Sequence, residues 1–458
     1  MHGHSAHLTT PSQPGRRLQW RSLALKSIAF GMALAATAPV QAKTFHCGAG
    51  DVPCLIAAIT EANTNGQKKN RIQLDAGTYT LMAADNDTDG PNGFPSITSD
   101  LDITGARDEA TTTIIERQAS ASTFRLIHVA ATGHLTLKRL TLRGGGFSGF
   151  APRLSGGGLF NRGGTVTITN STLTNNVASV GGALYNDGGT VTLTHSILSG
   201  NSAVPVGSGG GGLFNDRGTV TLTRSTLANN LSAQSGGGIW NFQGTVTISD
   251  SAIVSNRGND PGPGGILNSF GILTITNSTL SGNSGRNLGA IANAGTVTIL
   301  NSTISGNFST FGPGGISNGA GTVALQNTIL ALNSTGSRFE GPDCNAVTSL
   351  GNNLIGTTLR CTIVLQQSDL TGDSGLASFT DDGRPGNGHY PLLPTSRAIN
   401  AGNDAVCPER DQLGRERHHP CDIGAVEFPD LGQAEQDDDD DGQDGWHDDD
   451  DGQVGQTQ

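Results

Sequence analysis

Residues 156–176 read GGGLFNRGGTVTITNSTLTNN, and residues 181–201 repeat this pattern as GGALYNDGGTVTLTHSILSGN. Five further copies follow, to about residue 333. One asparagine marks each copy, and it occurs at Asn161, Asn186, Asn215, Asn241, Asn268, Asn293 and Asn318. Successive asparagines are 25, 29, 26, 27, 25 and 25 residues apart. A repeat of this length predicts a solenoid in which each copy makes one turn.

Each copy alternates apolar and polar residues, as short β-strands do. Val166 and Ile168 point to one side, and Thr165, Thr167 and Thr169 point to the other. Equivalent aliphatic residues form two columns, one of Val166, Val191, Val220, Val246, Leu273, Val297 and Val323 and one of Leu173, Leu198, Leu227, Ile253, Leu280, Ile304 and Leu330. Leucine-rich and helical repeats are disfavoured, because the copies are rich in Thr and Val and carry Gly or Asn at each corner.

Three short strands per turn, paired in parallel with their neighbours, fit this pattern, and parallel crossovers favour a right-handed winding. Less regular strand-like runs start upstream at Ile72. We therefore predict an all-β fold, a single-chain right-handed parallel β-helix of roughly 11–12 coils and about 55 Å in length. A short capping helix is expected before it, because Val52, Leu55 and Ile59 have helical spacing after Asp51.

The two ends of the chain differ from this body. Residues 1–42 carry arginines, then an apolar run over 28–40 and a small-residue cleavage site near Ala42, which is typical of a signal peptide. The paired Arg16 and Arg17 also fit a twin-arginine signal, but the general secretory route is favoured. We expect an N-terminal cap at 43–66, the β-helix at 67–340, C-terminal coils with a disulfide-stapled region at 341–429, and an acidic disordered tail at 430–458.

Charge and cysteine content limit the partners. The net charge is −12, and from Asp430 onward the sequence has 12 acidic residues and no Lys or Arg. We expect no nucleic-acid partner, no transmembrane segment in the mature chain, and a monomer. The six cysteines fall in close pairs, which predicts local disulfides rather than a metal site: Cys47 with Cys54, Cys344 with Cys361, and Cys407 with Cys421.

The chain resembles bacterial surface proteins of the pectin lyase-like superfamily that carry a choice-of-anchor Q domain. The most specific match is residues 392–428, which end in CDIGAVEF. The GGALYN and NSTLSGN repeats resemble those of polymorphic outer membrane proteins, and CLIAAITEAN resembles the N-terminal cap of such proteins, although its usual Arg-Glu is missing. The resemblance spans about residues 47–428 and implies a β-helix at the cell surface.

Many β-helix proteins of this superfamily cleave polysaccharides, so catalytic residues must be sought. Hydrolysis needs two carboxylates, and lyase chemistry needs a base with calcium or Arg beside the uronate. Residues 156–333 contain only four acidic residues, and neither set is evident. Asp187 and Asp216 occupy equivalent positions on adjacent coils. They are interpreted as turn residues, and the alternative is a pair that binds calcium or acts as acid and base. The repeated asparagines are interpreted as an internal hydrogen-bond ladder, and His195 as a surface residue.

An aromatic column precedes the repeated asparagine. It consists of one aromatic residue in each of four successive copies: Phe160, Tyr185, Phe214 and Trp240. Successive side chains of a strand point to opposite sides, so these rings should point outward because the aliphatic residue before each one points inward. Four outward rings would stack sugars or a partner surface. In the alternative, the long turns at 202–210 and 256–264 fold over them.

The acidic tail matches the frame of a calcium-binding loop at Asp437, Asp439, Asp441 and Asp448. Any run of aspartates matches it easily, so a solvated tail is the alternative. No other cofactor is expected.

Together these features predict a secreted or cell-surface protein that acts as a non-enzymatic adhesion or binding module for polysaccharide or another envelope component. The rival hypothesis is a polysaccharide lyase or glycoside hydrolase with an unrecognised site.

Overall fold

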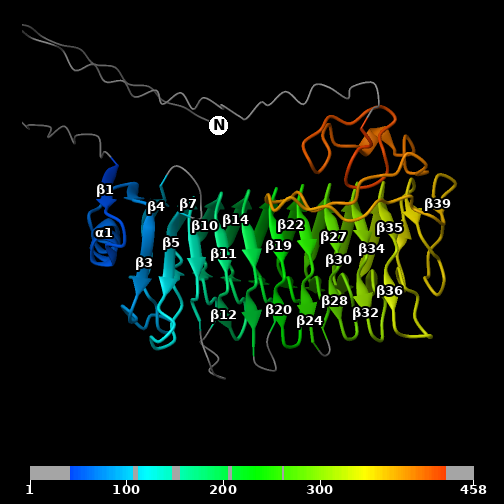
Figure 1. Cartoon of the computed structure of the whole chain (residues 1–458). Coiled ribbons are helices and arrows are strands. Elements are labelled where there is room, and N and C mark those ends of the chain that lie inside the picture. The colour runs from blue at the N-terminus through cyan, green and yellow to red at the C-terminus, as the bar shows by residue number, and fades with distance from the viewer. Residues whose placement is uncertain (1–41, 107–111, 147–154, 205–208, 260–261, 430–458) are drawn as a thin grey trace, which may run out of the picture. The chain divides into compact units, whose positions relative to one another are not determined.

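The structure is a computed structural model that describes residues 42–106, 112–146, 155–204, 209–259 and 262–429. Its strands form four parallel sheets that wind around one axis, so the described chain is a parallel β-helix (Figure 1). This confirms the predicted fold class, and the two longest sheets have 12 strands each, in agreement with the expected number of coils. No helix of the described residues is long and apolar enough to cross a membrane.

The first sheet contains the TVTIT segments of the repeat. Its strands, in order, are β1 (Lys43–Cys47), β2 (Asn70–Leu74), β4 (Asp100–Thr104), β7 (His134–Lys138), β10 (Thr165–Thr169), β14 (Thr190–Thr194), β18 (Thr219–Thr223), β22 (Thr245–Ser249), β26 (Ile272–Thr276), β30 (Thr296–Leu300), β34 (Thr322–Gln326) and β37 (Thr348–Ser349). Val166 is in register with Val191, which is in register with Val220. All three are fully buried, as the predicted apolar column requires.

The second sheet follows one corner later in each coil. Its strands are β3 (Gly77–Leu81), β5 (Thr113–Arg117), β8 (Thr141–Arg143), β11 (Thr172–Thr174), β15 (Ile197–Ser199), β19 (Thr226–Ala228), β23 (Ala252–Val254), β27 (Thr279–Ser281), β31 (Thr303–Ser305), β35 (Ile329–Ala331), β38 (Leu354–Ile355) and β39 (Leu370–Thr371). Leu173 and its equivalents on later coils lie in register inside the solenoid, so the second predicted column is also confirmed.

Two shorter sheets complete each coil. The third sheet consists of β12 (Val177–Ala178), β16 (Ser202–Ala203), β20 (Leu231–Ser232), β24 (Arg257–Gly258), β28 (Ser284–Gly285), β32 (Phe308–Ser309) and β36 (Ser334–Thr335). The fourth sheet consists of β6 (Ile127–Val129), β9 (Leu159–Arg162), β13 (Leu184–Asp187), β17 (Leu213–Asp216), β21 (Ile239–Phe242), β25 (Ile266–Ser269), β29 (Ile291–Asn293) and β33 (Ile316–Asn318). The expectation of three strands per turn was therefore wrong for the regular coils, which have four. The strands of the third sheet are only two residues long, too short to show an alternating pattern.

The N-terminal end carries the predicted capping helix, α1 (Val52–Thr64). Asp51 caps it by accepting a hydrogen bond from the backbone N–H of Cys54, and the disulfide between Cys47 and Cys54 ties the helix to β1. The segment at 43–66 is more than a cap, because β1 pairs with β2 and so belongs to the first sheet.

Side-chain ladders run through the solenoid. The repeated asparagines form the predicted one, in which Asn161 Nδ2 donates to Asn186 Oδ1 at 2.8 Å and Asn186 Nδ2 donates to Asn215 Oδ1 at 2.8 Å. A second ladder was missed, and it comprises Asn176, Asn201, Asn230, Asn256, Asn283, Asn307 and Asn333. These buried amides satisfy corner backbone groups that would otherwise lack partners.

The second ladder ends on a carboxylate. Asp343 is buried, and its two oxygens accept from the Asn333 side chain and from the backbone N–H of Thr357. Burial raises the pKa of Asp343 to about 6. An acceptor-only group suits this position because donors approach from both sides, whereas an asparagine would oppose the Thr357 N–H with its own N–H.

The corner between the first and second sheets is left-handed. It has φ between 43° and 49° at Asn170, His195, Arg224, Asp250, Asn277, Asn301 and Asn327. Asparagine tolerates this conformation, which accounts for its frequency there. His195, expected at the surface, is partly buried, and burial and the neighbouring Arg224 lower its pKa.

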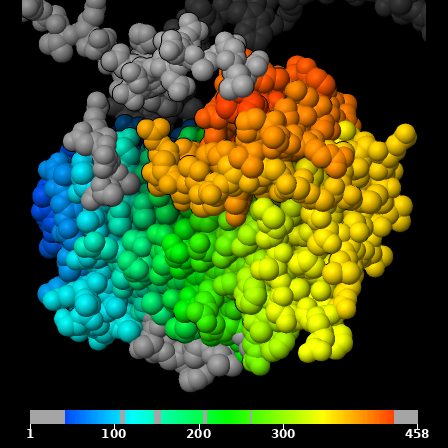
Figure 2. Space-filling model, turned by 45° about the vertical axis from the view of Figure 1, so that its right-hand side comes forward, coloured from blue at the N-terminus to red at the C-terminus, as the bar shows by residue number. Residues whose placement is uncertain are grey.

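Residues 375–429, called the C-terminal strap below, do not form further coils but lie back along the second sheet. Figure 2 shows this segment, in orange, lying over the green middle of the solenoid. Its backbone and side chains contact outward residues of several coils. Gly386 N–H donates to Thr226, Gln412 accepts from Thr279, and Ala425 N–H donates to Thr303. The predicted disulfides Cys407–Cys421 and Cys344–Cys361 are both formed, the first within the strap and the second just before it.

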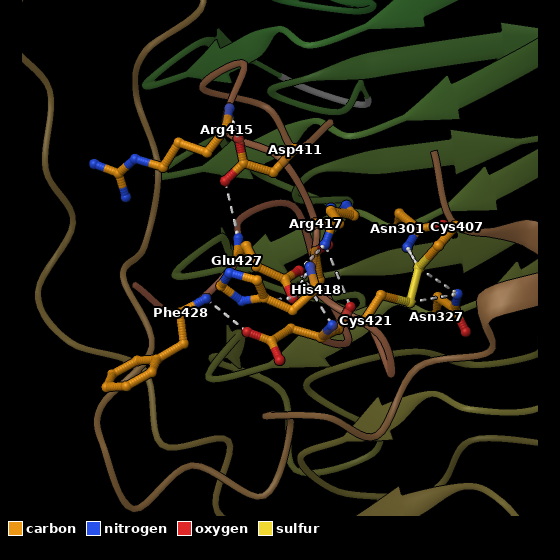
Figure 3. Close-up of polar contacts among 12 residues, drawn as sticks. Asn301, Asn327, Cys407, Asp411, Arg415, Arg417, His418, Cys421, Glu427 and Phe428 are labelled. Carbon is orange, nitrogen blue, oxygen red and sulfur yellow. Dashed lines mark hydrogen bonds and ion pairs between the residues drawn. A yellow bond between two sulfur atoms is a disulfide. The ribbon is translucent and has the colours of Figure 1, made fainter. Parts of the chain in front are cut away.

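The CDIGAVE segment holds the strap to the solenoid (Figure 3). Arg417, which is buried, pairs with Glu427 at 2.9 Å and donates to Asn277 and to the carbonyls of Gly424 and Ala425. This segment is therefore structural, because Glu427 is buried and paired with Arg417, which in turn contacts the solenoid corner at Asn277.

Candidate functional site

The predicted aromatic column lies on the fourth sheet. Phe160 and Tyr185 stack with ring centroids 4.9 Å apart, Tyr185 and Phe214 at 5.1 Å, and Phe214 and Trp240 at 4.6 Å. The preceding aliphatic residues are buried inside, as expected. Successive rungs about 4.8 Å apart bring the rings into this continuous stack.

The stack leaves little ring surface for a ligand. Phe160 and Phe214 are each only 7% exposed. Gly209 packs so closely on Trp240 that a side chain there would overlap the indole ring, and the Arg125 guanidinium lies 4.8 Å from the centre of Phe160. Because the ring faces contact one another, the column presents mainly edges. Sugar binding by these four residues stays a prediction.

Asp187 and Asp216 lie in register on β13 and β17, immediately beside this column. Arg217 contacts both carboxylates, with Nη2 3.5 Å from Asp187 Oδ1 and Nε 3.0 Å from Asp216 Oδ1. Tyr185 donates its hydroxyl to Asp216 at 3.4 Å. Burial raises the pKa of Asp216, and Arg217 partly offsets this rise. The carboxylates are thus paired with an arginine of the adjoining turn.

A buried polar cluster at the N-terminal end of the column was missed in the sequence. His128 Nδ1 lies 2.9 Å from the Ser96 hydroxyl, and its Nε2 lies 3.3 Å from Asp89, which also pairs with Arg162. Burial, strengthened by the Arg125 guanidinium, lowers the pKa of His128 to about 4. His128 is in register with Phe160, but the coil that carries it lacks the repeat's consensus.

Stability is expected to depend on pH through His128. Between its ordinary pKa of 6.5 and about 4, the unfolded chain binds a proton that the folded chain does not, so stability falls as pH falls. At about 1.4 kcal/mol per pKa unit, lowering the pH from 7 to 4.5 costs about 2.5 kcal/mol. His128→Gln should remove this loss, as measured by urea unfolding at both pH values.

The difference between the wild type and His128→Gln isolates the histidine. Asp343 acts in the opposite direction, because its raised pKa of about 6 makes the folded state gain stability as pH falls toward 4. It contributes equally to both proteins. Equal pH-dependent losses in the two proteins would contradict the assignment.

A groove on the third sheet has a different composition. It has a volume of about 470 Å³ and crosses β24, β28 and β32. Arg257, Arg286, Phe308 and Phe311 line its walls, and all four side chains are exposed. Gly258 and Gly285 lie in register beneath them and leave room between the walls. Sequence reasoning missed this groove because the register of two-residue strands is not visible in the repeat.

The walls of this groove are held in place by backbone bonds. Phe311 N–H donates to the backbone carbonyl of Arg286 at 2.9 Å, and Phe308 N–H donates to the backbone carbonyl of Asn283 at 3.0 Å. The Arg286 guanidinium lies 5.4 Å from the centre of the Phe311 ring. This cation–π contact orients the charge and one ring together.

The described residues contain no candidate metal site. Within the ranges that the structure covers, no group of three or more His, Cys, Asp and Glu side chains is placed to hold an ion. The predicted calcium positions Asp437, Asp439, Asp441 and Asp448 lie outside the described residues, as does the signal peptide up to residue 41.

Comparisons with known proteins agree with the architecture. Residues 125–335 match the family model described as "Right handed beta helix region". Among solved structures, pectate lyase Pel9A is similar, with 16% identity, a TM-score of 0.51, and coverage of 81% of this chain and 90% of that one. The A-module of the Azotobacter vinelandii mannuronan C-5 epimerase AlgE4 has 14% identity, a TM-score of 0.38, and coverage of 71% and 95%. No curated protein matches the sequence. The chain is a right-handed parallel β-helix protein with the pectin lyase-like fold.

Proposed function

We propose that this protein is an exported, non-enzymatic module that binds acidic polysaccharide at the cell surface or outside the cell. The observation that carries this proposal is the groove on the third sheet, where two exposed guanidinium groups and two exposed phenyl rings line one cavity. The signal-peptide pattern supports export. The disulfides also suit an oxidising compartment.

The chemistry of the groove fits a chain of acidic sugars. Apolar faces of pyranose rings stack on aromatic side chains, and Phe308 and Phe311 supply these surfaces at one end. Arginine binds carboxylates through paired N–H groups, and Arg257 and Arg286 stand on adjacent coils. Three neighbouring coils give the groove a length of about 10 Å, which is the scale of a short oligosaccharide.

Acidic rather than neutral sugars are the preferred class, because the groove lining, within the residues that the structure describes, contains two arginines and no carboxylate: Arg257, Gly258, Asn259, Ser284, Gly285, Arg286, Phe308, Thr310 and Phe311. The two guanidinium groups attract the carboxylates of acidic sugars, an attraction that a neutral glycan does not offer. We therefore expect binding that weakens with added salt.

Affinity electrophoresis through gels containing polygalacturonate, alginate or dextran tests the proposal. The acidic polymers should retard the protein and dextran should not. Arg257→Gln and Arg286→Gln should each weaken binding about tenfold, which corresponds to the loss of one charged hydrogen-bonded contact. Phe308→Ala with Phe311→Ala should weaken it by a similar factor.

Phe270→Ala provides a matched control, since Phe270 is 67% exposed and lies outside the groove. It should leave retardation unchanged. Equal retardation of the wild type and the groove variants would contradict this site, and retardation by dextran would contradict the ligand class.

The same samples test the rival enzyme hypothesis. Release of unsaturated or reducing ends from the acidic polymers, abolished by Asp187→Ala or Asp216→Ala, would overturn the non-enzymatic assignment. The contacts of Arg217 with both carboxylates favour a structural role for that pair.

A further inference from the structure

A second and larger groove lies at the other end of the solenoid. Its volume is about 860 Å³, and it follows the first sheet and the corner after it. One wall is a column of outward residues in register on five successive strands of the first sheet, His46, Gln73, Thr104, Lys138 and Thr169. Four steps between five coils make the groove about 19 Å long.

The groove is basic. Arg71, Lys138 and Arg139 line it, together with His46, and among the described residues of its lining Asp75 is the one carboxylate. The Nε of Arg139 is buried and has no hydrogen-bond partner among the described residues. A buried donor without a partner is costly, so an acceptor supplied by a bound group is expected there.

The C-terminal strap covers the same corner farther along the solenoid but stops short of the groove. Asn277, Asn301 and Asn327 all contact the strap at this corner. Gly386 is packed against Arg224 and Asp250. The equivalent corner positions Arg139 and Asn170 instead line the groove.

We propose that this groove binds the acidic tail of the same chain, with the aspartate run at 448–451 lying along the basic wall. The segment from 430 to 458 has 12 acidic residues and no Lys or Arg, so its charge is complementary to that of the groove. Four extended residues span about 13 Å, which fits within the groove's length. Carboxylates supply the acceptors that Arg139 lacks.

The tail is long enough to reach this position. Ala425, four residues before the end of the strap, contacts Thr303 of β31, which follows β30 in the same coil. Six coil steps separate β30 from β7, which carries Lys138. This distance is about 29 Å along the axis. The 18 residues from 430 to 447 extend to about 60 Å, which is about twice the distance to be covered. Docking would occupy the groove with an internal polyanion and keep other polyanions out of it.

Carbodiimide coupling tests the contact, because it joins a lysine amine to a touching carboxylate as an amide. The sequence has only five lysines, at 26, 43, 68, 69 and 138. In the full chain at low salt, Lys138 should couple to the aspartates at 448–451, and Lys68, which is exposed and outside the groove, should not. Mass spectrometry of the digest identifies each pair. At 0.5 M NaCl the Lys138 product should decline sharply.

Variants that keep Lys138 supply the control. Arg71→Gln with Arg139→Gln should reduce the Lys138 product at least about fivefold, whereas Arg257→Gln in the other groove should leave it unchanged. Coupling spread evenly over Lys43, Lys68, Lys69 and Lys138, or no coupling at Lys138, would overturn the proposal. Products joining isotopically heavy and light chains would show that the tail comes from a second copy, which would also overturn it. None of these outcomes depends on polysaccharide binding.

Discussion

Arg417→Met is expected to lower the free energy of unfolding of the C-terminal strap by about 3–5 kcal/mol. The guanidinium is 1% exposed and pairs with Glu427, which is 3% exposed. Removing it leaves a buried carboxylate without its counter-charge, and burial already raises the pKa of Glu427. It also removes the donors to Gly424 and Ala425. Hydrogen exchange and limited proteolysis should show that the strap opens before the solenoid.

Arg410→Met is the matched control for this prediction. Arg410 lies in the same strap and pairs with Glu416, but both side chains are more than half exposed. Exposed ion pairs contribute at most about 1 kcal/mol, so this variant should behave almost as the wild type. Similar opening of the strap in the two variants would show that the buried pair does not hold it.

Asn230→Leu is expected to destabilise the solenoid by about 4 kcal/mol, although the two side chains have the same number of non-hydrogen atoms and the same branching. The Asn230 oxygen accepts from the backbone and side chain of Asn201, and its Nδ2 donates to Leu198 and Asn256. Leucine leaves these buried groups without partners at about 1–3 kcal/mol each. Chemical unfolding followed by circular dichroism measures the loss.

Thr221→Ala provides a comparison on the outer face of the same coil, where Thr221 is only partly buried. It should change stability by less than about 0.5 kcal/mol. If both variants lost the same stability, the inner ladder would contribute nothing beyond ordinary packing.

The sequence predicted those parts of the structure that repeat. Val166 and Leu173 head columns that lie in register, and Asn161 begins the expected ladder. The second ladder was equally visible, because the asparagine equivalent to Asn176 recurs in every copy. It was overlooked because it lies at the corner between the second and third sheets, after a strand of only three residues.

The remaining features depend on contacts that no repeat encodes. The groove between Arg257 and Phe311 arises from two-residue strands whose register only the coordinates reveal. The strap depends on long-range contacts such as that of Arg417 with Asn277. Likewise, the alternation of side chains along a strand predicted that Tyr185 points outward, but its stacking on Phe214 depends on the spacing of neighbouring coils.

The register of successive coils is tested most directly by distances between spin labels on the outer face of the first sheet. All six native cysteines are in disulfides, so introduced cysteines are the labelling sites. Labels at 167 and 274, at 167 and 298, and at 136 and 324 are separated by four, five and seven coil steps. Double electron–electron resonance should give distances near 19, 24 and 34 Å, rising by about 4.8 Å per coil. Distances that do not increase with the number of coils between the labels would contradict the β-helix.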